Sequence, residues 1–486
     1  MAGWARCKPI EATLRREAGR TLKPTLSWPH LVALGVGSII GTGIYTLTGV
    51  GADRAGPGVV LAFGIAGVIC AFAALAYAEL STLMPAAGSA YTYVYSALGE
   101  ALAWLIGWSM VLEYLLGASG VAVGWSAYLV GWLHSQFGLD FPVWMLAGPL
   151  SGGLLNVPAV LVALLVAAFL AFGMRESATF NIVLVAIKLV ALTAFVVLVA
   201  PAVQGKNFHP FMPYGFPSHV VGDAKRGVMA AASIVFFAFY GFDAVSTASE
   251  EAKRPGRDLT IGLLGSLGVS TLIYMAVSAS AVGALSYTVF AKSSEPLALV
   301  LRALGHPVSA GWIAGAALIA LPSVILVDMY AQSRIFFVMS RDGLLPRSLG
   351  KVNKSFGTPV VMTLLTGAFV AVVGGLLPLA KIAELANSGT LAAFSAVALS
   401  MMVLRIRRPD LPRVFKTPLW WLVGPLAIAG CLWLFTSLAT STMLYFAGWN
   451  ALGLAVYFAF GFWNSRVGRG LELEPAEPAK AAAQER

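Results

Sequence analysis

The chain alternates between long apolar stretches and short polar ones over most of its length. Twelve apolar stretches have about the length that a helix needs to cross a bilayer, roughly 20 residues. Polar segments at residues 1–29 and 467–486 flank them, and no soluble domain fits between them. The pattern predicts an all-α polytopic membrane protein with twelve transmembrane helices at residues 31–54, 58–84, 101–132, 156–174, 178–200, 228–249, 258–284, 309–339, 358–378, 382–404, 419–438 and 441–463.

Glycines interrupt the first of these stretches. In GVGSIIGTGIYTLTG (residues 35–49), Gly41, Thr42 and Gly43 stand in the middle of an apolar segment. Glycine costs roughly 1 kcal/mol relative to alanine inside a helix, so the segment predicts a discontinuous helix. Hydrocarbon cannot satisfy the backbone groups that a break exposes, and such breaks persist where they line a cavity or bind a ligand. The alternative is a kink that only aids helix packing.

The sixth stretch contains a second interruption. In SIVFFAFYGFDAVSTASEE (residues 233–251), Gly241 is followed by Asp243. Helices 1 and 6 open two halves of five helices each, and the halves enter the membrane from opposite sides because five is odd. Interrupted helices at corresponding positions of inverted halves indicate the binding site of a secondary transporter. The predicted parts are an N-terminal tail (1–29), a first inverted repeat with helices 1–5 (30–200), a second with helices 6–10 (201–405), helices 11 and 12 (406–466), and a disordered C-terminal tail (467–486).

Composition supports the membrane class, and charge orients the chain. Of the 486 residues, 58% are hydrophobic and 11% are charged, whereas soluble proteins carry about 25% charged residues. Most of the 32 Lys and Arg residues lie in the two tails and in the connections after helices 6, 8 and 10. By the positive-inside rule both termini are then cytoplasmic. The net charge of +10 is thus a topology signal, and no nucleic acid partner is predicted.

Several longer motifs are familiar. They are GSIIGTGIY, YAELSTLMPAAGSAYTYVYSALGE (residues 77–100), FFAFYGFDAVSTASEEAKRPGRDL (236–259), SRDGLLP (340–346) and RRPDLPRVFKTP (407–418). With them the chain resembles the amino acid–polyamine–organocation superfamily over about residues 27–465, and within it most resembles bacterial members of the cationic amino acid transporter family. The resemblance implies a five-plus-five inverted repeat with two further helices, in a bacterial inner membrane. Thr260 departs from the pattern, since relatives commonly have proline there.

The break in helix 1 suits the backbone of an α-amino acid. Free N–H groups after Gly43 favour a carboxylate, and the carbonyls before Gly41 favour an ammonium group. The resemblance implies that carbonyls of helix 6 complete the ammonium site. The predicted substrate site at the two breaks therefore comprises Ile39, Gly41, Thr42, Gly43, Phe237, Ala238 and Tyr240.

Lys188 lies near the middle of helix 5. An ammonium group at that depth has to pair with carbonyls or a carboxylate, and intramembrane ionisable residues are functional by default. In sodium-coupled relatives of this fold a sodium ion lies between helices 1 and 8, and the resemblance implies that a helix-5 lysine replaces it in proton-coupled members. The hypothesis is that charged Lys188 holds the helix-1 break together and neutral Lys188 loosens it. The alternative is a static structural cation.

Two acidic residues, Glu113 in helix 3 and Asp328 in helix 8, are also placed at mid-depth. The resemblance puts Asp328 beside the substrate side chain, where relatives that take neutral amino acids commonly have an apolar or small residue. The aspartate therefore favours arginine, lysine or ornithine, with Glu113 as a second acidic wall. The alternative is that Asp328 pairs internally with Lys188 or Arg334.

Two further acids have predicted roles as a gate or a cap. Asp243 follows the second break and is predicted to cap the half-helix after it, with membership of a proton path as the alternative. Glu79 lies near the cytoplasmic end of helix 2, in an inside gate or a structural ion pair.

The sequence contains no GxxxxGK[ST] motif, no cluster of metal ligands and no paired nucleophile and base, so neither ATP-driven transport nor an enzyme is predicted. No cofactor or metal is expected.

The predicted function is secondary active, proton-coupled symport of L-amino acids with a preference for cationic ones. The alternatives are a neutral, alanine-type symporter or an exchanger of an amino acid for its amine; a channel or a transport-incompetent sensor is remote. The predicted partners are the L-amino acid, H+ and membrane lipid, and a small single-span subunit is left open.

Overall fold

The computed structural model describes residues 6–10, 26–85, 88–172, 178–222, 224–248, 252–350 and 359–471. Within these ranges, nine helical segments are long and apolar enough to cross a membrane, and three shorter helices of ten to seventeen residues are also apolar. Each of the twelve predicted stretches falls on helix. The pattern of apolar positions therefore located the long helices correctly.

The helices, in chain order, are α2 (Trp28–Ile39), α3 (Thr42–Tyr45), α4 (Leu47–Ala55), α5 (Val59–Leu83), α6 (Ser89–Ala97), α7 (Glu100–Phe137), α8 (Val157–Ala171), α9 (Ala178–Val199), α10 (Val228–Val235), α11 (Ala244–Thr247), α12 (Pro255–Ala284), α13 (Tyr287–Phe290), α14 (Pro296–Ala303), α15 (Pro307–Arg341), α16 (Val360–Leu376), α17 (Leu379–Arg407), α18 (Trp420–Ser437), α19 (Thr440–Val456) and α20 (Phe462–Asn464). One short hairpin joins β1 (His219–Val221) to β2 (Ala224–Arg226). A 3₁₀ segment, Phe236–Phe239, continues α10.

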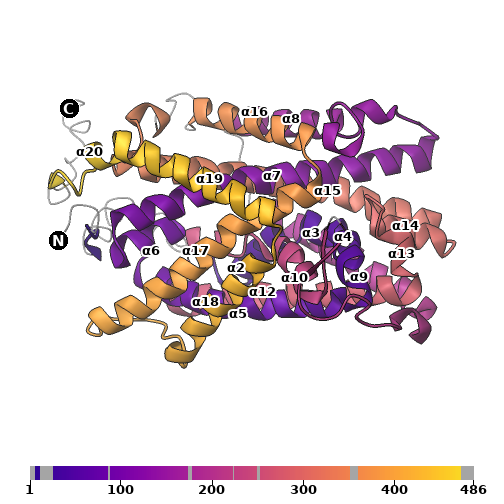
Figure 1. Cartoon of the computed structure of the whole chain (residues 1–486), viewed down its shortest axis with the longest axis horizontal. Helices are drawn as coiled ribbons and strands as arrows, with labels where there is room; N and C mark the ends of the chain where they lie inside the picture. The colour runs from indigo at the N-terminus through magenta and orange to yellow at the C-terminus, as the bar shows by residue number, and fades with distance from the viewer. Residues whose placement is uncertain are drawn as a thin grey trace.

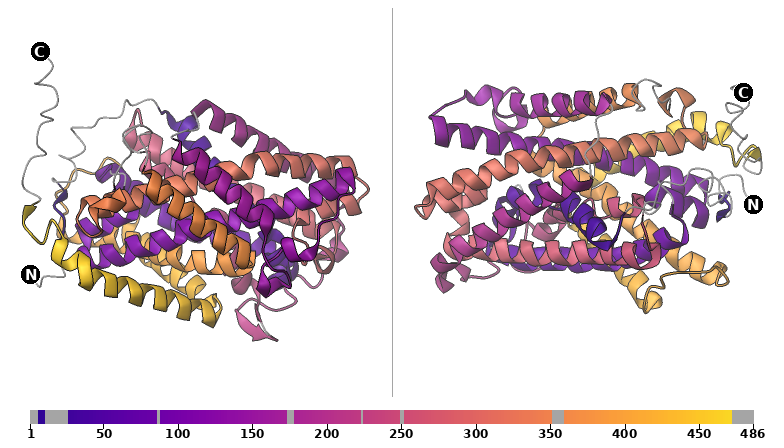
Figure 2. Two further views of the ribbon diagram at one scale, coloured as in Figure 1. Left: turned by 90° about the horizontal axis from the view of Figure 1, so that it is seen from above. Right: turned by 180° about the vertical axis from the view of Figure 1, so that it is seen from behind.

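The two longest helices, α7 and α15, run through the bundle and pack against each other (Figure 1). On one edge α8 and α16 lie side by side, as both side views show (Figures 1 and 2). On the other side of the bundle α12 packs against α2 and α5. The first half of the second interrupted helix, α10, is buried throughout, and α2 is buried over its last five residues, Gly35–Ile39.

The bundle has two distinct ends. Residues 6–10, α6 and α20 meet at one of them, called the terminal end here, where the Arg6 guanidinium lies 5.3 Å from the centre of the Phe462 ring. At the opposite end lie α13 and α14, and this is called the α14 end (Figure 1). Within the predicted polar tail, Lys8 and Ile10 are buried, so this part of the tail packs on the bundle.

Three described helices were not predicted. They are α6, α13 and α14, with nine, four and eight residues. Each is too short to cross a membrane, so the search for spans treated them as connections. The helix α6 lies within the long motif of residues 77–100 and is fully buried.

Candidate functional site

The first interruption lies at Ile40 and Gly41. The helix α2 ends at Ile39, Ile40 and Gly41 have extended backbones (φ −77°, ψ 91° and φ −135°, ψ −150°), and α3 begins at Thr42. The predicted break at residues 41–43 is therefore one or two residues too late, because Thr42 and Gly43 are already helical. The N–H groups free for an anion start at Thr42, and a single non-helical residue, Thr46, separates α3 from α4.

Gly43 lies in the first turn of α3, against the second interrupted helix. A Cβ atom at this position would lie 2.3 Å from the Cα atom of Ala238, which is closer than real Cβ atoms come to backbone. The first turn of α3 therefore touches the backbone of the second interrupted helix. Gly43 permits this contact between the two breaks instead of forming the break itself.

The second interruption spans Phe236 to Asp243. The helix α10 ends at Val235, and the 3₁₀ segment and a turn follow before α11 begins at Ala244. Gly241 has a φ of +95°, a conformation that residues with a Cβ atom rarely adopt. The predicted glycine thus lies in the turn, and a Cβ there would also approach Ser38 of α2 to 3.1 Å.

A tyrosine that the sequence did not single out joins the two breaks. The Tyr274 hydroxyl, from α12, lies 2.7 Å from the carbonyl oxygen of Ile39 and 2.9 Å from that of Ala238. Both carbonyls were predicted to face an ammonium group. Because a hydroxyl has one proton to donate, it satisfies one carbonyl fully at a time and leaves hydrogen-bonding capacity on the other. No sequence signal distinguishes Tyr274 from other aromatic residues of an apolar helix.

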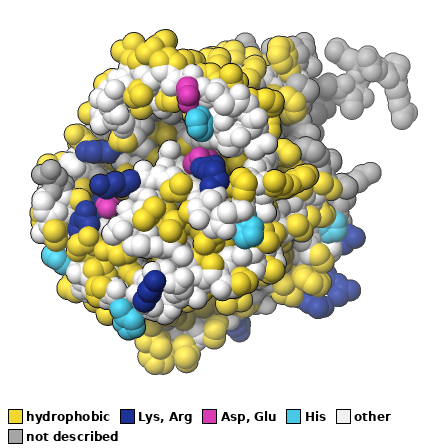
Figure 3. Space-filling model, turned by 90° about the vertical axis from the view of Figure 1, so that its right-hand side faces the viewer, with side chains coloured by type: hydrophobic (Ala, Val, Ile, Leu, Met, Phe, Trp, Pro, Cys, Tyr) yellow, Lys and Arg dark blue, Asp and Glu magenta, His cyan; other side chains and the backbone are white. Residues whose placement is uncertain are grey.

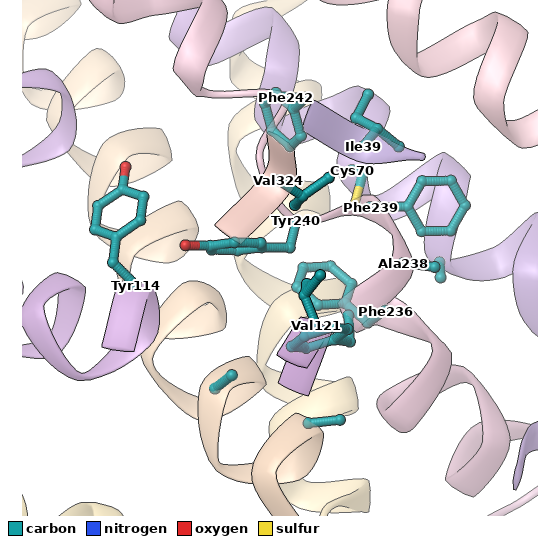
Figure 4. Packing of buried hydrophobic residues seen from close by; sticks show 14 of the residues in the cluster. Ile39, Cys70, Tyr114, Val121, Phe236, Ala238, Phe239, Tyr240, Phe242 and Val324 are labelled. Atoms are coloured by element: carbon teal, nitrogen blue, oxygen red, sulfur yellow. The ribbon is translucent and has the colours of Figure 1, made fainter. Parts of the chain in front are cut away.

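Aromatic side chains surround the second break. The Phe237 and Tyr240 rings stack with their centres 6.0 Å apart, and the Tyr114 ring of α7 meets Tyr240 edge-on at 5.9 Å. In Figure 4 the Tyr240 ring extends from the break towards Tyr114, with Val324 beside it. Val324 of α15 also lies 3.6 Å from the Cβ position of Gly41. Side chains of α7 and α15 and these rings therefore pack beside both breaks.

Lys188 is fully buried and donates to the first broken helix. Its Nζ lies 2.7 Å from the carbonyl oxygen of Gly37, in the last turn of α2. The predicted position beside the helix-1 break is therefore where the structure places the ammonium group. No ion pair joins Asp328 to Lys188 or Arg334 in the described part of the chain.

Three carboxyl groups lie at the breaks: Glu113 of α7, Asp328 of α15 and Asp243 of the helix-6 turn, with 2%, 3% and 2% of their surfaces exposed. The capping prediction for Asp243 is wrong. Its backbone (φ −66°, ψ −18°) is helical instead of extended, and the side chain makes no capping bond to α11. Its Oδ2 atom accepts instead from the Tyr114 hydroxyl at 3.3 Å.

Glu79 forms a buried ion-pair cluster at the end of α5. Arg405 donates to Oε2 at 2.7 Å, Arg413 Nε to Oε1 at 3.0 Å, and the Thr417 backbone N–H to Oε2 at 2.8 Å. Arg413 also donates to four backbone carbonyls of residues 404–411. Of the two predicted roles, this geometry matches the structural ion pair, which fastens the α17–α18 connection to α5.

The terminal end is closed by a second buried pair. Lys8 Nζ lies 2.9 Å from Asp342 Oδ1, and the Tyr91 hydroxyl donates to Asp342 Oδ2 at 3.0 Å. Burial raises the pKa of the Asp342 carboxyl, but the Lys8 ammonium and its hydrogen bonds outweigh this and hold that pKa below its usual value. Lys8 and Asp342 are 2% and 1% exposed. The segment 6–10 is thus fixed to α15.

At the α14 end a cavity of ≈ 680 Å³ reaches the first broken helix. Its walls come from α7, the loop before α14 and the start of α17, and Thr46, directly after α3, contributes to its lining. Figure 3 views the molecule from this end, where scattered basic, acidic and histidine side chains lie among hydrophobic ones. The structure is therefore hollow on the α14 side of the breaks and closed by ion pairs at the terminal end.

A bundle of apolar helices with two interrupted helices in contact at its centre is the architecture of a membrane transporter. A family model described as "Amino acid permease" matches residues 26–460. The chain belongs to the amino acid permease family, and with it to the amino acid–polyamine–organocation superfamily. Its family makes it a multi-pass membrane transporter and not an enzyme.

Individual relatives have different named substrates. The chain is 42% identical over 467 residues to the branched-chain amino acid permease BcaP of Bacillus subtilis, covering 95% of this chain and 98% of the relative. It is 40% identical over 472 residues to the methylthioribose transporter of the same organism (96% and 100%). The vacuolar cationic amino acid transporter 4 of Arabidopsis thaliana is 35% identical over 401 residues (82% and 66%). The family supports amino acid transport, while these names do not agree on a side chain.

Proposed function

We propose that this protein is a secondary active transporter that carries α-amino acids into the cell with protons. In this proposal twelve helices cross a bacterial inner membrane as a five-plus-five inverted repeat followed by two helices. Both termini lie in the cytoplasm, so the terminal end is cytoplasmic and the cavity at the α14 end opens outside. The positions of the two breaks, in the first helix of each half, support the repeat.

The substrate backbone would bind at the breaks. Its carboxylate meets the N–H groups from Thr42 onwards, at the positive end of the helical segment that reaches Ala55. Its ammonium group meets the carbonyl groups of Ile39 and Ala238, which share the Tyr274 hydroxyl. Three ammonium hydrogens satisfy both carbonyls better than one hydroxyl hydrogen does, so this contact favours an amine over an empty site.

The preferred side chain in this proposal is cationic. The observation that carries it is the pair of buried carboxyl groups of Glu113 and Asp328, each with an oxygen that has no hydrogen-bond partner. A Cβ atom on Gly117 would lie 3.0 Å from Asp328 Oδ2 and 2.8 Å from the Tyr240 ring. Glycine at this position therefore lets α7 pack directly against the carboxyl group and the ring, so that α7, α15 and the helix-6 turn converge there.

Branched-chain amino acids are the second candidate. Two relatives with this name, from Bacillus subtilis and Lactococcus lactis, are 42% and 36% identical to the chain over most of its length. Val324, Phe237 and the Tyr240 ring place apolar surface beside the breaks, which suits a branched aliphatic side chain.

Proton coupling in this proposal depends on Lys188. Its ammonium group lies on the carbonyl of Gly37, one turn before the break. Loss of its proton removes a charge-assisted hydrogen bond from the end of α2 and loosens the break.

Uptake of labelled arginine, valine and alanine into proteoliposomes, under imposed pH and sodium gradients, tests the proposal. We expect uptake that follows the proton gradient and ignores sodium, with arginine as the better substrate. Better uptake of valine would favour the second candidate. Sodium-dependent uptake that ignores pH contradicts proton coupling, and absence of uptake of all three contradicts amino acid transport.

A further inference from the structure

The carboxyl groups at the breaks form one cluster. Glu113, Asp243 and Asp328 come from three different elements, and each has a buried oxygen atom without a hydrogen-bond partner: Oε2, Oδ1 and Oδ2, respectively. Natural proteins leave few buried polar atoms unpaired, and each such atom calls for an explanation. Three of them on three acids at one site is an unusual concentration.

Aromatic residues show how close the three groups lie. Tyr114 donates to Asp243 and packs edge-on against Tyr240. Tyr240 and Asp328 Oδ2 both come within about 3 Å of the Cβ position of Gly117. Asp243 and Asp328 also act electrostatically on Glu113. The three carboxyl groups therefore face one region, with Tyr240 among them.

One further polar side chain at this depth is unpartnered. The amide oxygen and nitrogen of Gln332 make no hydrogen bond to a protein atom, whereas the Tyr240 hydroxyl lies beside the Asp328 carboxyl group. Gln332 is fully buried and lies one helical turn after Asp328, hence on the same face of α15. Donor and acceptor groups without partners beside three acids indicate that the site is built to hold something besides protein.

The cluster has no basic partner in the described part of the chain. The titratable groups that face it are tyrosines: Tyr77 of α5, Tyr114 of α7 and Tyr240 of the turn. Among the described residues, the side-chain groups that act on the three carboxyl groups are the acids themselves and hydroxyl groups, and none is a Lys or Arg. Removing one carboxylate from water costs several kcal/mol, and like charges at close range add to that cost. Three ionised carboxylates cannot coexist there, so the cluster has to carry protons or another cation.

We propose that Glu113, Asp243 and Asp328 form a shared cation site that holds protons when the substrate side chain is neutral, and that a cationic side chain displaces one of these protons. The proposal rests on the proposed function and adds the groups that carry the transported protons. When a guanidinium or ammonium group enters, it donates to a carboxylate, and the carboxyl group that loses its proton releases it to water. The charge of the occupied site is unchanged by this exchange.

The exchange predicts a stoichiometry that depends on the substrate. A neutral amino acid moves together with a proton, whereas a cationic one moves with one proton fewer. Both therefore transfer the same net charge. A transporter whose protons are carried only by Lys188 moves the same number of protons with either substrate.

Proteoliposomes with a trapped pH dye and a set membrane potential measure protons and charge per substrate for valine and arginine. We expect one proton fewer per arginine than per valine, at equal charge. The same proton count for both contradicts the proposal, and so does failure of arginine to bind. In Asp243→Asn, we expect valine uptake to move fewer protons. The control Asp53→Asn, at a half-exposed surface pair with Arg226, should leave the count unchanged.

Infrared spectroscopy of the unmodified protein tests the cluster without transport. Buried protonated carboxyl groups give a C=O band distinct from that of carboxylates. We expect this band at neutral pH, a loss of intensity when arginine binds, and a weaker band in Asp243→Asn and Glu113→Gln. Absence of the band at neutral pH contradicts the proposal even if amino acids are transported. If the band is present but no amino acid is taken up, the proposed function is contradicted, while the inference that the three carboxyl groups hold protons is still supported.

Discussion

At the scale of single residues, the buried polar groups of Lys188 and Asp328 differ in whether the protein supplies their hydrogen-bond partners. Lys188 is satisfied by a backbone carbonyl of α2, while Asp328 keeps an oxygen without a partner. A charge that is already hydrogen-bonded holds structure in place, and an unsatisfied one is available to a ligand. The two residues can therefore be tested separately, one through pH dependence and the other through specificity.

Replacing Lys188 by alanine removes the donor from the Gly37 carbonyl, a loss of roughly 1.5–3 kcal/mol for a hydrogen bond to a charged group. If Lys188 couples transport to protons, the variant loses the dependence of uptake on the proton gradient. Initial uptake rates at several external pH values measure this. Lys225→Ala is a suitable control because Lys225 also donates to backbone carbonyls, at the α14 end. An unchanged pH dependence in Lys188→Ala would falsify the coupling role.

Replacing Asp328 by methionine exchanges the carboxyl group for an apolar side chain of adequate length. Loss of a charge-assisted contact of roughly 1.5–3 kcal/mol corresponds to a rise of about tenfold to a hundredfold in KM for arginine. Valine uptake should persist or improve. Competition between labelled valine and unlabelled arginine gives both values in one preparation. Arginine uptake that survives intact would show that Asp328 does not recognise the side chain.

At the scale of elements, the sequence predicted the long helices and the presence of both breaks, but not how the breaks touch. Apolar length and helix-breaking glycines are local signals, so they are visible in one dimension. The contact of Gly43 with Ala238 and the bridge from Tyr274 depend on helices far apart in the sequence. For the same reason the sequence predicted Glu113 and Asp328 as two walls of one site, whereas their grouping with Asp243 required the fold.

Tyr274→Phe tests whether the two interrupted helices act as one unit. The change removes a hydroxyl that serves the carbonyls of Ile39 and Ala238, with a net loss of about 1 kcal/mol per hydrogen bond. We expect a higher KM for all amino acids, since the ammonium site loses its preset geometry, with a small fall in melting temperature. Tyr457→Phe removes one buried donor to Glu100, far from the breaks. A fall in melting temperature in both variants without a change in KM would mean that Tyr274 only stabilises the fold.

At the scale of the whole molecule, the two ends differ in how they are held. The cavity at the α14 end extends to Thr46, whereas buried ion pairs at Glu79 and Asp342 fasten connections and the segment 6–10 to the terminal end. Passage of a substrate towards the terminal end requires that some of these contacts break. Of these contacts, the Lys8–Asp342 pair links segments that are far apart in the sequence, because it joins the N-terminal segment 6–10 to the end of α15.

The pH dependence of this pair has a definite sign. Because folding lowers the pKa of Asp342 from its usual 3.8, its carboxylate stabilises the docked segment above that pH, and the contribution is lost only as the pH falls below it. Mild acidification therefore leaves the segment docked. Dependence of uptake on pH near neutrality has to come from other groups, such as those at the breaks.

Asp342→Asn should release the segment 6–10, and Cys7 reports the release. Breaking a buried ion pair costs about 3–5 kcal/mol because the remaining charge is unpaired. Cys70 and Cys431 are buried and Cys7 is partly exposed, so a membrane-impermeant maleimide added at the terminal side labels Cys7. Burial, partly offset by Arg407, raises the pKa of the Cys7 thiol, which slows labelling of the docked segment.

We expect labelling of Cys7 to be at least about tenfold faster in Asp342→Asn than in the native protein. Cys7→Ser should show no labelling, and Asp410→Asn, which changes an exposed surface acid, should be labelled at the native rate. Equal rates in the native protein and Asp342→Asn would mean that other contacts hold the segment and that the Lys8 pair does not close this end.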